Sequence, residues 1–506
     1  MRKLRVRLCC TAILLLSACN QVFGLDATRP GDAAEPPAQI LRLRFAYQVA
    51  ETSATGNPLE VPSLIPIPIL TVRFGSIDGP LEPATYDPET GEVALPLEAL
   101  GAEWRLEYAI GSGIPREIHW STPLDGIPQI TEPVFGRLDR VAVPSGSGYT
   151  IDTFGSGNNP PYLFPRVLTT GVWTITALGD SSNAPVSLPF DSVKPVSGAL
   201  GQPQSSLGDR GVFVAYNVNA TCNYARGTAR FDPPVLQEAM LTPVTAAWSS
   251  QLNSGIVFDY SGAGADDSRL STALGDRAGA KSNRVHLGFA PHAGMPLLSD
   301  DDLQVGFPSP PFLSLVDCVL GTTDPTTFAD LPLFGFPRLA YAHFEETRTV
   351  NGLALTSAVA TVSITPNNLF ALDLKIPIAT GPIQLTHGGG TLDLSGPTDG
   401  LVLPRGSPSL RLTFGLEVLV GGGVHSLGVD LYKLDAGSLQ HVRTYLIANA
   451  SKRELVLDPS SLSAGEFVFA ISARRGTPRA AAGDFVTVTY PQAVSKVFTR
   501  TFVVPP

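Results

Sequence analysis

Short segments in which apolar and polar residues alternate recur along this chain from residue 40 onward. The segments LRLRFAY (41–47) and EWRLEYAI (103–110) each place apolar residues at every second position. Because successive side chains of a β-strand point to opposite faces, this pattern predicts strands with one buried face. Glycine and proline, 49 and 45 of the 506 residues, supply turns between such segments. The sequence therefore predicts an all-β protein of tandem β-sandwich domains.

The first predicted domain covers residues 40–135. Between its strands, the segment YDPETGEVALPL (86–97) sets Pro88 and Gly91 where a tight turn needs a fixed and a permissive backbone. This layout resembles the prealbumin-like and immunoglobulin-like sandwiches of secreted bacterial proteins. The resemblance implies two packed sheets for this region.

The middle region, residues 136–389, combines strand patterns with long turn-rich segments. RGVFVAYNV (210–218) is typical of a buried strand. Segments 144–162 and 261–283 are rich in glycine, serine and aspartate, and irregular stretches of this length are uncommon inside a compact domain. We expect one or two further β-domains here, with long loops.

The last predicted domain covers residues 390–506. Its segment RELVLDPSSLSAGEFVFAISARRG (453–476) resembles the later strands of a fibronectin type III domain. The matching positions are Leu457, Pro459, Gly465, Phe467, Phe469, Ile471 and Ala473. Phe467 stands where the family usually has tyrosine, and no tryptophan follows Trp248, so the resemblance implies a general immunoglobulin-like sandwich.

The first residues have the pattern of an export signal. Arg2, Lys3, Arg5 and Arg7 precede an apolar stretch over 8–18. Eleven helical residues rise about 16 Å, which is too short for a hydrocarbon core of about 30 Å. Leu16-Ser17-Ala18-Cys19 resembles the lipobox of bacterial lipoproteins. The alternative is an ordinary secretory signal with an incidental cysteine.

The lipobox resemblance implies a cleaved signal peptide over 1–18 and a diacylglycerol-modified Cys19 as the first mature residue. Residues 19–39, small, polar and rich in proline, then form a flexible tether to the first domain. Membrane lipid is thus the expected partner of the acylated cysteine. The inner-membrane retention signal has aspartate directly after the acylated cysteine. This chain has Asn20 at that position, which favours the outer membrane. The Phe-Gly-Leu-Asp run at 23–26 resembles lipoproteins of myxobacteria.

Two cysteines, Cys222 and Cys318, remain in the mature chain besides Cys19. In an oxidising envelope, two leftover cysteines are expected to pair. The disulfide closes a loop of about 100 residues, which stabilises by about 4.7 kcal/mol in the chain-entropy model. Two separate buried thiols are the alternative.

The charge of the chain argues against nucleic acid as a partner. The formal net charge of −10 becomes −14 once the four basic residues of the signal are removed. A nucleic-acid binder needs a basic stripe, and the sequence has none.

Candidate catalytic and metal-binding motifs are incomplete. The string HGGG (387–390) matches an oxyanion-hole motif, but no G-x-S-x-G elbow accompanies it, so we interpret it as a β-turn. Two groups of residues are of the types that bind zinc: His286 with His292, and His343 with Glu345. Neither group has a third and fourth ligand at a recognisable spacing. The acidic runs 266–267 and 300–302 lack the spaced oxygens of a calcium loop. No catalytic residue, metal or cofactor is predicted.

Three functions are consistent with these observations. The first is a lipid-anchored envelope lipoprotein that acts by binding, adhesion or scaffolding, without catalysis. The second is a surface hydrolase or glycan-binding protein with its site in the loops of residues 150–320, where Tyr162 and Phe164 could stack on a sugar. The third is a subunit of a larger envelope assembly. The sequence does not separate the first from the third.

Overall fold

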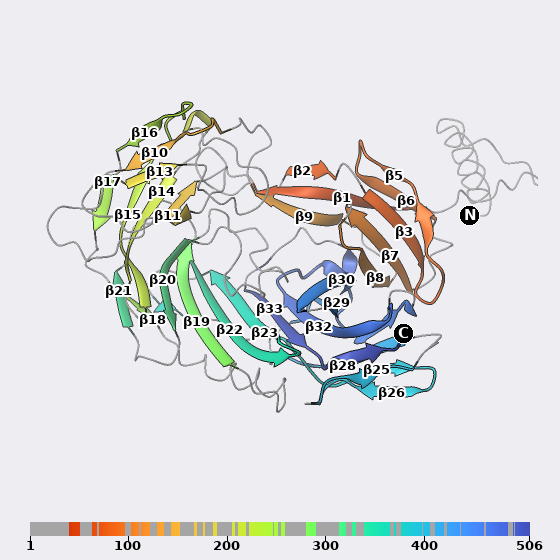
Figure 1. The fold of residues 1–506 in the computed structure, drawn as a ribbon. Coiled ribbons are helices and arrows are strands. Elements are labelled where there is room, and N and C mark those ends of the chain that lie inside the picture. Colours follow the sequence, from red (N-terminus) through yellow and green to blue (C-terminus); the bar gives the residue numbers. More distant parts are fainter. Residues whose placement is uncertain are drawn as a thin grey trace, which may run out of the picture.

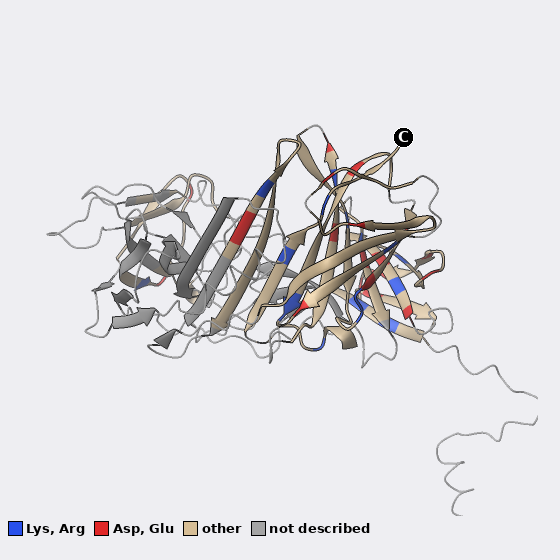
Figure 2. Ribbon diagram, turned by 90° about the horizontal axis from the view of Figure 1, so that it is seen from below, with Lys and Arg blue, Asp and Glu red and all other residues tan. Residues whose placement is uncertain are grey.

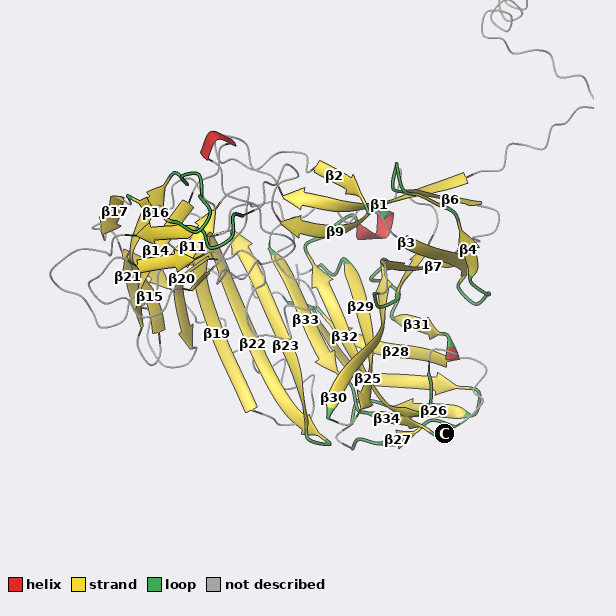
Figure 3. Ribbon diagram, turned by 45° about the horizontal axis from the view of Figure 1, so that its top comes forward, coloured by secondary structure: helices red, strands yellow, loops and turns green. Residues whose placement is uncertain are grey.

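The computed structural model describes most residues of 40–151 and 338–506, with gaps in both ranges. Between these ranges it describes separate segments within 166–329. Strands dominate these residues, and the helical segments, such as Ser205–Leu207 and Ala480–Ala482, are single 3-10 turns (Figure 3). The all-β prediction is confirmed. The described strands form sheets of 5, 3, 19, 3 and 4 strands.

Residues 40–135 fold into a two-sheet sandwich. Its described strands are β1 (Ile40–Ala50), β2 (Ser63–Pro66), β3 (Leu70–Ser76), β4 (Glu82–Ala84), β5 (Tyr86–Asp87), β6 (Glu92–Pro96), β7 (Glu103–Ile110), β8 (Arg116–Ser121) and β9 (Gln129–Phe135). One sheet has the order β2-β1-β6-β5, with β9 parallel to β1. The other contains β3, β4, β7 and β8 and belongs to the large sheet.

The core of this N-terminal sandwich comes from the predicted alternation. Leu43 and Phe45 of β1 pack with Trp104, Leu106 and Tyr108 of β7, and all five side chains are buried. The remaining buried members are Ile67, Val72, Phe74, Val93, Leu95, Ile118, Trp120 and Ala448. Alternating residues of two strands thus meet from opposite sheets, as a sandwich requires.

The predicted turn at 86–97 lies between β5 and β6. The Asp87 carboxylate accepts hydrogen bonds from the Glu89 amide at 2.9 Å and the Thr90 hydroxyl at 2.8 Å. Gly91 has φ of 72°, in the left-handed region that glycine adopts without strain. A side-chain-capped turn followed by glycine therefore reverses the chain at this point.

Separate strands are described in the middle region. They are β10 (Gly148–Ile151), β11 (Arg166–Thr169), β12 (Thr176–Ala177), β13 (Val186–Pro189), β14 (Gly211–Val218), β15 (Cys222–Phe231), β16 (Leu241–Val244), β17 (Ala247–Ser250), β18 (Gly255–Phe258), β19 (Ala280–Phe289), β20 (Leu313–Val319), β21 (Thr326–Ala329), β22 (Arg338–Val350), β23 (Leu353–Ile364) and β24 (Leu369–Phe370). The expected strand at 210–218 is confirmed as β14.

The C-terminal region forms a second sandwich. Its described strands are β25 (Ile378–His387), β26 (Gly390–Asp393), β27 (Leu401–Val402), β28 (Leu410–Glu417), β29 (Ser426–Asp435), β30 (Ser438–Ile447), β31 (Glu454–Leu457), β32 (Gly465–Arg475), β33 (Gln492–Phe498) and β34 (Phe502–Val504). The sheet β26-β25-β28-β31 packs on the part of the large sheet that contains β29, β30 and β32. This sandwich includes β25, which begins ahead of the expected boundary at 390.

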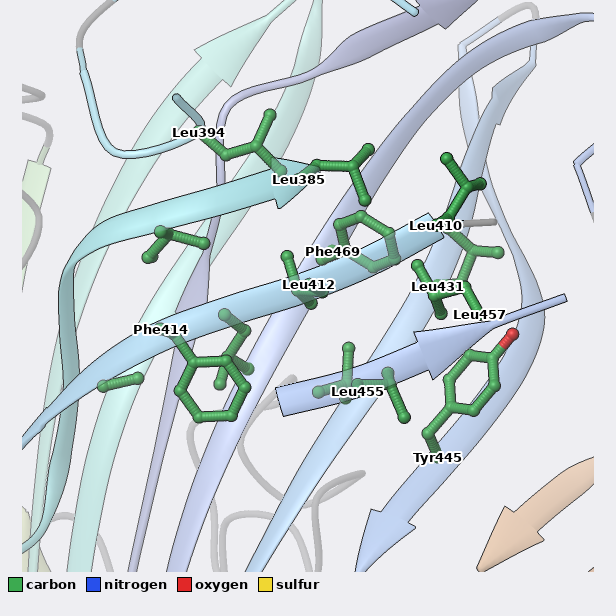
Figure 4. Packing of buried hydrophobic residues seen from close by; sticks show 14 of the residues in the cluster. Leu385, Leu394, Leu410, Leu412, Phe414, Leu431, Tyr445, Leu455, Leu457 and Phe469 are labelled. Carbon is green, nitrogen blue, oxygen red and sulfur yellow. The ribbon is translucent and has the colours of Figure 1, made fainter. Parts of the chain in front are cut away.

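Leucines and aromatic residues fill the C-terminal core (Figure 4). Leu385, Leu410 and Leu412 come from one sheet and Leu431 and Phe469 from the other. Phe467, where a fibronectin type III domain usually has tyrosine, is buried and stacks on Phe502 with ring centroids 5.8 Å apart. A buried phenyl ring needs no hydrogen-bond partner, so this position is filled by packing alone.

One continuous sheet joins the two sandwiches. Strand β8 runs parallel to β30, with Tyr445 opposite Glu117 and Ile447 opposite His119. The sheet continues from β30 through β29, β32, β33 and β23 to β22 and β19 (Figure 1). The two sandwiches are therefore connected by main-chain hydrogen bonds.

The two cores lie on opposite faces of this sheet. Ile447 of β30 belongs to the C-terminal core, whereas its neighbours Leu446 and Ala448 pack in the N-terminal core. Successive residues of a strand point to opposite faces, so the C-terminal end of β30 packs against a core on each side. Glu117 and His119 of β8 are opposite Tyr445 and Ile447 of β30. They therefore lie on the same face of the sheet as the C-terminal core.

Candidate functional site

A buried ionic cluster lies where the two sandwiches meet, and Glu117 of β8 is at its centre. The Glu117 side chain is 0% exposed. Its Oε1 is 3.3 Å from Nη1 of Arg105 and 2.9 Å from Nε2 of His119. Its Oε2 accepts a hydrogen bond from Nη1 of Arg443 at 2.9 Å. Because Arg443 belongs to β30, this cluster joins the two sandwiches by charge as well as by main-chain pairing.

The cluster continues outward along β7 and β3. Arg443 also pairs with Glu107 at 2.7 Å, and the other oxygen of Glu107 pairs with Arg73 at 3.1 Å. Burial raises the pKa of Glu117, but the hydrogen bond from His119 and the charges of Arg105 and Arg443 outweigh it, so the net pKa is lowered. Burial lowers the pKa of Arg443, and its neighbours, Tyr445, Glu107 and Glu117, raise it above its ordinary value. Both groups are charged at neutral pH.

A second ionic cluster lies on the opposite face of the large sheet. Lys496 of β33 is 0% exposed, and the Asp430 side chain of β29 is 4% exposed. Nζ of Lys496 is 3.2 Å from Oδ2 of Asp430 and donates to the Tyr432 hydroxyl at 3.1 Å. The Thr444 hydroxyl donates to Oδ1 of Asp430 at 2.7 Å. Nε2 of His441 is 3.3 Å from the same oxygen.

The electrostatics of this cluster favour an ionised carboxylate. Burial raises the pKa of Asp430, but the hydrogen bond from His441 and the Lys496 charge more than reverse this, and the pKa lies well below its ordinary value. The His441 ring stacks on Tyr432 with centroids 4.7 Å apart. Lys496 and Asp430 are buried too deeply for a dissolved substrate to reach them, so they act on their neighbours within the protein.

The cysteines of the predicted disulfide are brought together by the fold. Strand β15 pairs antiparallel with β20, and Cys222 is directly opposite Cys318 in this pairing. Opposite residues of an antiparallel pair have Cα atoms about 4.5 or 5.5 Å apart, within the range of about 4.4–6.8 Å that disulfides use. Cys19 and the whole lipobox lie outside the described residues.

The other candidate motifs are placed as follows. The string HGGG is confirmed as a turn: His387 pairs with Gly390 across the hairpin of β25 and β26. His286 is opposite Tyr341 and Asp317, and His343 is opposite Arg284, in the register of the large sheet. His292, the aspartates at 266–267 and 300–302, and the aromatic residues Tyr162 and Phe164 lie outside the described residues.

Sequence reasoning missed both ionic clusters. Arg105 and Glu107 occupy the polar positions of an alternating strand and have the pattern of a solvent-facing side. For the second cluster, a signal was present in the segments GVDLYKL (428–434) and VSKVFT (494–499), where an aspartate or a lysine lies between apolar residues of a strand. A charge at such a position needs a buried partner.

No family model matches the chain, and no curated protein matches it. In the part of the chain that the structure describes, no helix is long and apolar enough to cross a membrane. The same residues hold no group of three or more histidine, cysteine and acidic side chains that could bind a metal. Acidic and basic residues are interspersed along the described strands (Figure 2).

Proposed function

We propose that this protein is a lipid-anchored envelope lipoprotein that binds or scaffolds other envelope components and is not an enzyme. The observation that supports this proposal is the junction of the two sandwiches. Main-chain pairing of β8 with β30 and the buried contact of Glu117 with Arg443 hold them in one orientation. A rigid body on a flexible tether presents its surfaces away from a membrane, as a scaffold or adhesion protein requires.

The anchor is the Cys19 lipid, as implied by the lipobox. Two or three acyl chains hold a protein far more firmly than one, since each buried CH2 contributes about 0.8 kcal/mol. Neither a membrane-spanning helix nor a membrane protein partner is then needed for attachment. Acylation and the outer membrane as the site of attachment are both part of this proposal.

Fractionation of cells that express the wild type and the Cys19→Ser variant tests the anchor. We expect the wild type in the outer-membrane fraction, with an intact mass that starts at Cys19 and includes acyl groups. The variant should leave the membrane fraction while keeping the circular dichroism of a β protein. Wild-type protein that starts at another residue and carries no acyl mass would contradict the anchor.

The disulfide between Cys222 and Cys318 is proposed on the register of β15 and β20. Reduction of the unfolded wild type should add two hydrogens to its mass and release two thiols that alkylate. Cys222→Ser and Cys318→Ser form a matched pair, and each should have one reactive thiol without reductant. Two alkylated thiols in the unreduced wild type would show that the cysteines are free.

The finer sandwich class is also a proposal. Phe467, Phe469 and Ile471 line the C-terminal core at alternate positions, in keeping with the fibronectin type III resemblance. The N-terminal sandwich likewise suits an immunoglobulin-like or prealbumin-like class. A crystal structure with complete strand connections would decide between them.

A further inference from the structure

We propose that Lys496 and Asp430 react with each other and form an intramolecular amide bond that crosslinks strands β33 and β29. This inference goes beyond the proposed envelope function and does not depend on it. Its basis is the contact of a fully buried primary amine with a buried carboxyl group, 3.2 Å from Nζ to Oδ2.

The sheet holds the two groups in place. Both strands pair with β32, which lies between them: Asp430 is opposite Ala470, and Lys496 is opposite Ser472. On its other side, β33 pairs with β23, where Ala358 is opposite Lys496. Two groups held in contact by the fold react as if at very high concentration, because the entropy of association is already lost.

The pair is ionised at rest, and apolar side chains surround its amine. The Lys496 amine lies 5.4 Å from the ring centre of Tyr432 and 6.0 Å from that of Phe498. Both rings belong to an apolar cluster with Val468, Ala470 and other buried residues. Burying an ion pair costs more desolvation than burying a neutral group of similar size. Converting the ammonium and carboxylate into an amide removes both charges from this site.

The reaction is a condensation that needs no co-reactant. The Lys496 ammonium first transfers a proton to the Asp430 carboxylate, which leaves a neutral amine beside a carboxylic acid. The nitrogen lone pair attacks Cγ, and the N–C bond forms. A base accepts a second proton from nitrogen and returns it to the hydroxyl oxygen, and the C–O bond breaks as water leaves. Ammonium and carboxylate thus become one amide and one water.

His441 lies beside the carboxyl group to which that proton is returned. Its Nε2 is 3.3 Å from Oδ1 of Asp430 and 3.0 Å from the Thr444 hydroxyl, which bonds to the same carboxylate oxygen. An imidazole accepts and returns a proton near neutral pH more readily than other side chains do. We expect His441 to act as the general acid that gives a proton to the leaving oxygen and then recovers the one released from nitrogen.

The intact mass of the denatured, reduced protein tests the crosslink. We use the Cys19→Ser form, so that acyl groups do not complicate the mass. The expected mass is lower than the sequence mass by one water. Trypsin should fail to cleave after Lys496 and should release a branched peptide that contains both Asp430 and Lys496. A full sequence mass would overturn the proposal, because the pair would then be an ion pair only.

Variants separate the crosslink from other losses of water. Lys496→Arg keeps a cation but lacks the primary amine and should have the full sequence mass. A water loss that persists in this variant would also refute the proposal. Asp430→Asn offers an amide carbon to the same amine and should lose one ammonia. His441→Gln should slow the condensation in newly made protein, which a time course of intact masses measures.

Discussion

Replacement of Glu117 by glutamine tests whether the buried cluster holds the two sandwiches together. Glutamine keeps the size of the side chain and one acceptor oxygen but removes the charge. Arg105 and His119 then lose their acidic partner, while Arg443 keeps its 2.7 Å contact with Glu107. Removing one partner of a buried ion pair lowers the free energy of unfolding by about 3–5 kcal/mol. Because Arg443 keeps an acidic partner, we expect a loss near the lower end, about 3 kcal/mol.

Urea unfolding at neutral pH, followed by tryptophan fluorescence, measures this loss. Trp104 and Trp120 lie in the N-terminal core beside the cluster and report on its opening. The matched control is Glu454→Gln, because Glu454 pairs with Arg411 at the surface. An exposed pair of this kind contributes less than about 1 kcal/mol. Equal unfolding midpoints for Glu117→Gln and the wild type would refute the role of the cluster.

The pH dependence of the same pair of proteins gives a second test. The pKa of Glu117 is lowered in the folded protein from a reference value of 4.5. Its contribution to stability is therefore complete above pH 4.5 and is lost as the pH falls through the folded pKa. The stability difference between wild type and Glu117→Gln should be largest at neutral pH and shrink on acidification. A difference that grows below pH 4.5 would contradict this assignment.

Other positions yield further predictions, each checked by urea or thermal unfolding. Phe467→Tyr should destabilise the C-terminal sandwich by about 1–3 kcal/mol, because the added hydroxyl enters a packed core against Phe502; an unchanged midpoint would disprove this packing. Gly91→Ala should lower the stability of the fold more than Gly437→Ala does. Both glycines have positive φ, but a Cβ at Gly91 would lie 2.5 Å from the Phe45 carbonyl oxygen, whereas a Cβ at Gly437 would meet nothing within 4 Å. We expect about 1–2 kcal/mol of strain at either site and a further loss at Gly91; equal losses would contradict the close approach. If Cys222 and Cys318 form the proposed disulfide, replacing either cysteine by serine should cost about 2–5 kcal/mol, and an unchanged midpoint in both variants would contradict the bridge.

Much of the fold was predictable because strand alternation is a local property. The N-terminal core contains the described apolar residues of segments 41–47 and 103–110, as their alternation predicts. The turn within 86–97 also forms, as its proline, aspartate and glycine indicate. The HGGG string likewise forms the expected turn. Each of these features depends on residues within a few positions of one another.

The ionic clusters were not predictable, because each depends on strands far apart in the chain. Glu117 meets Arg443, and Asp430 meets Lys496, only through the pairing order of the large sheet. A polar residue in an alternating strand normally faces water, and nothing near Glu117 in sequence shows that a second sandwich covers this face. The opposition of Cys222 and Cys318 has the same origin.

The sequence by itself determined the all-β class, the strand positions confirmed in both sandwiches, and the local turns. These follow from side-chain periodicity and from the backbone preferences of glycine and proline, which act over a few residues. Only the tertiary structure decided that β8 pairs with β30, so that one sheet serves both sandwiches and carries their cores on opposite faces. Strand order depends on long-range packing and hydrogen bonding, and it is strand order that brings buried charges together.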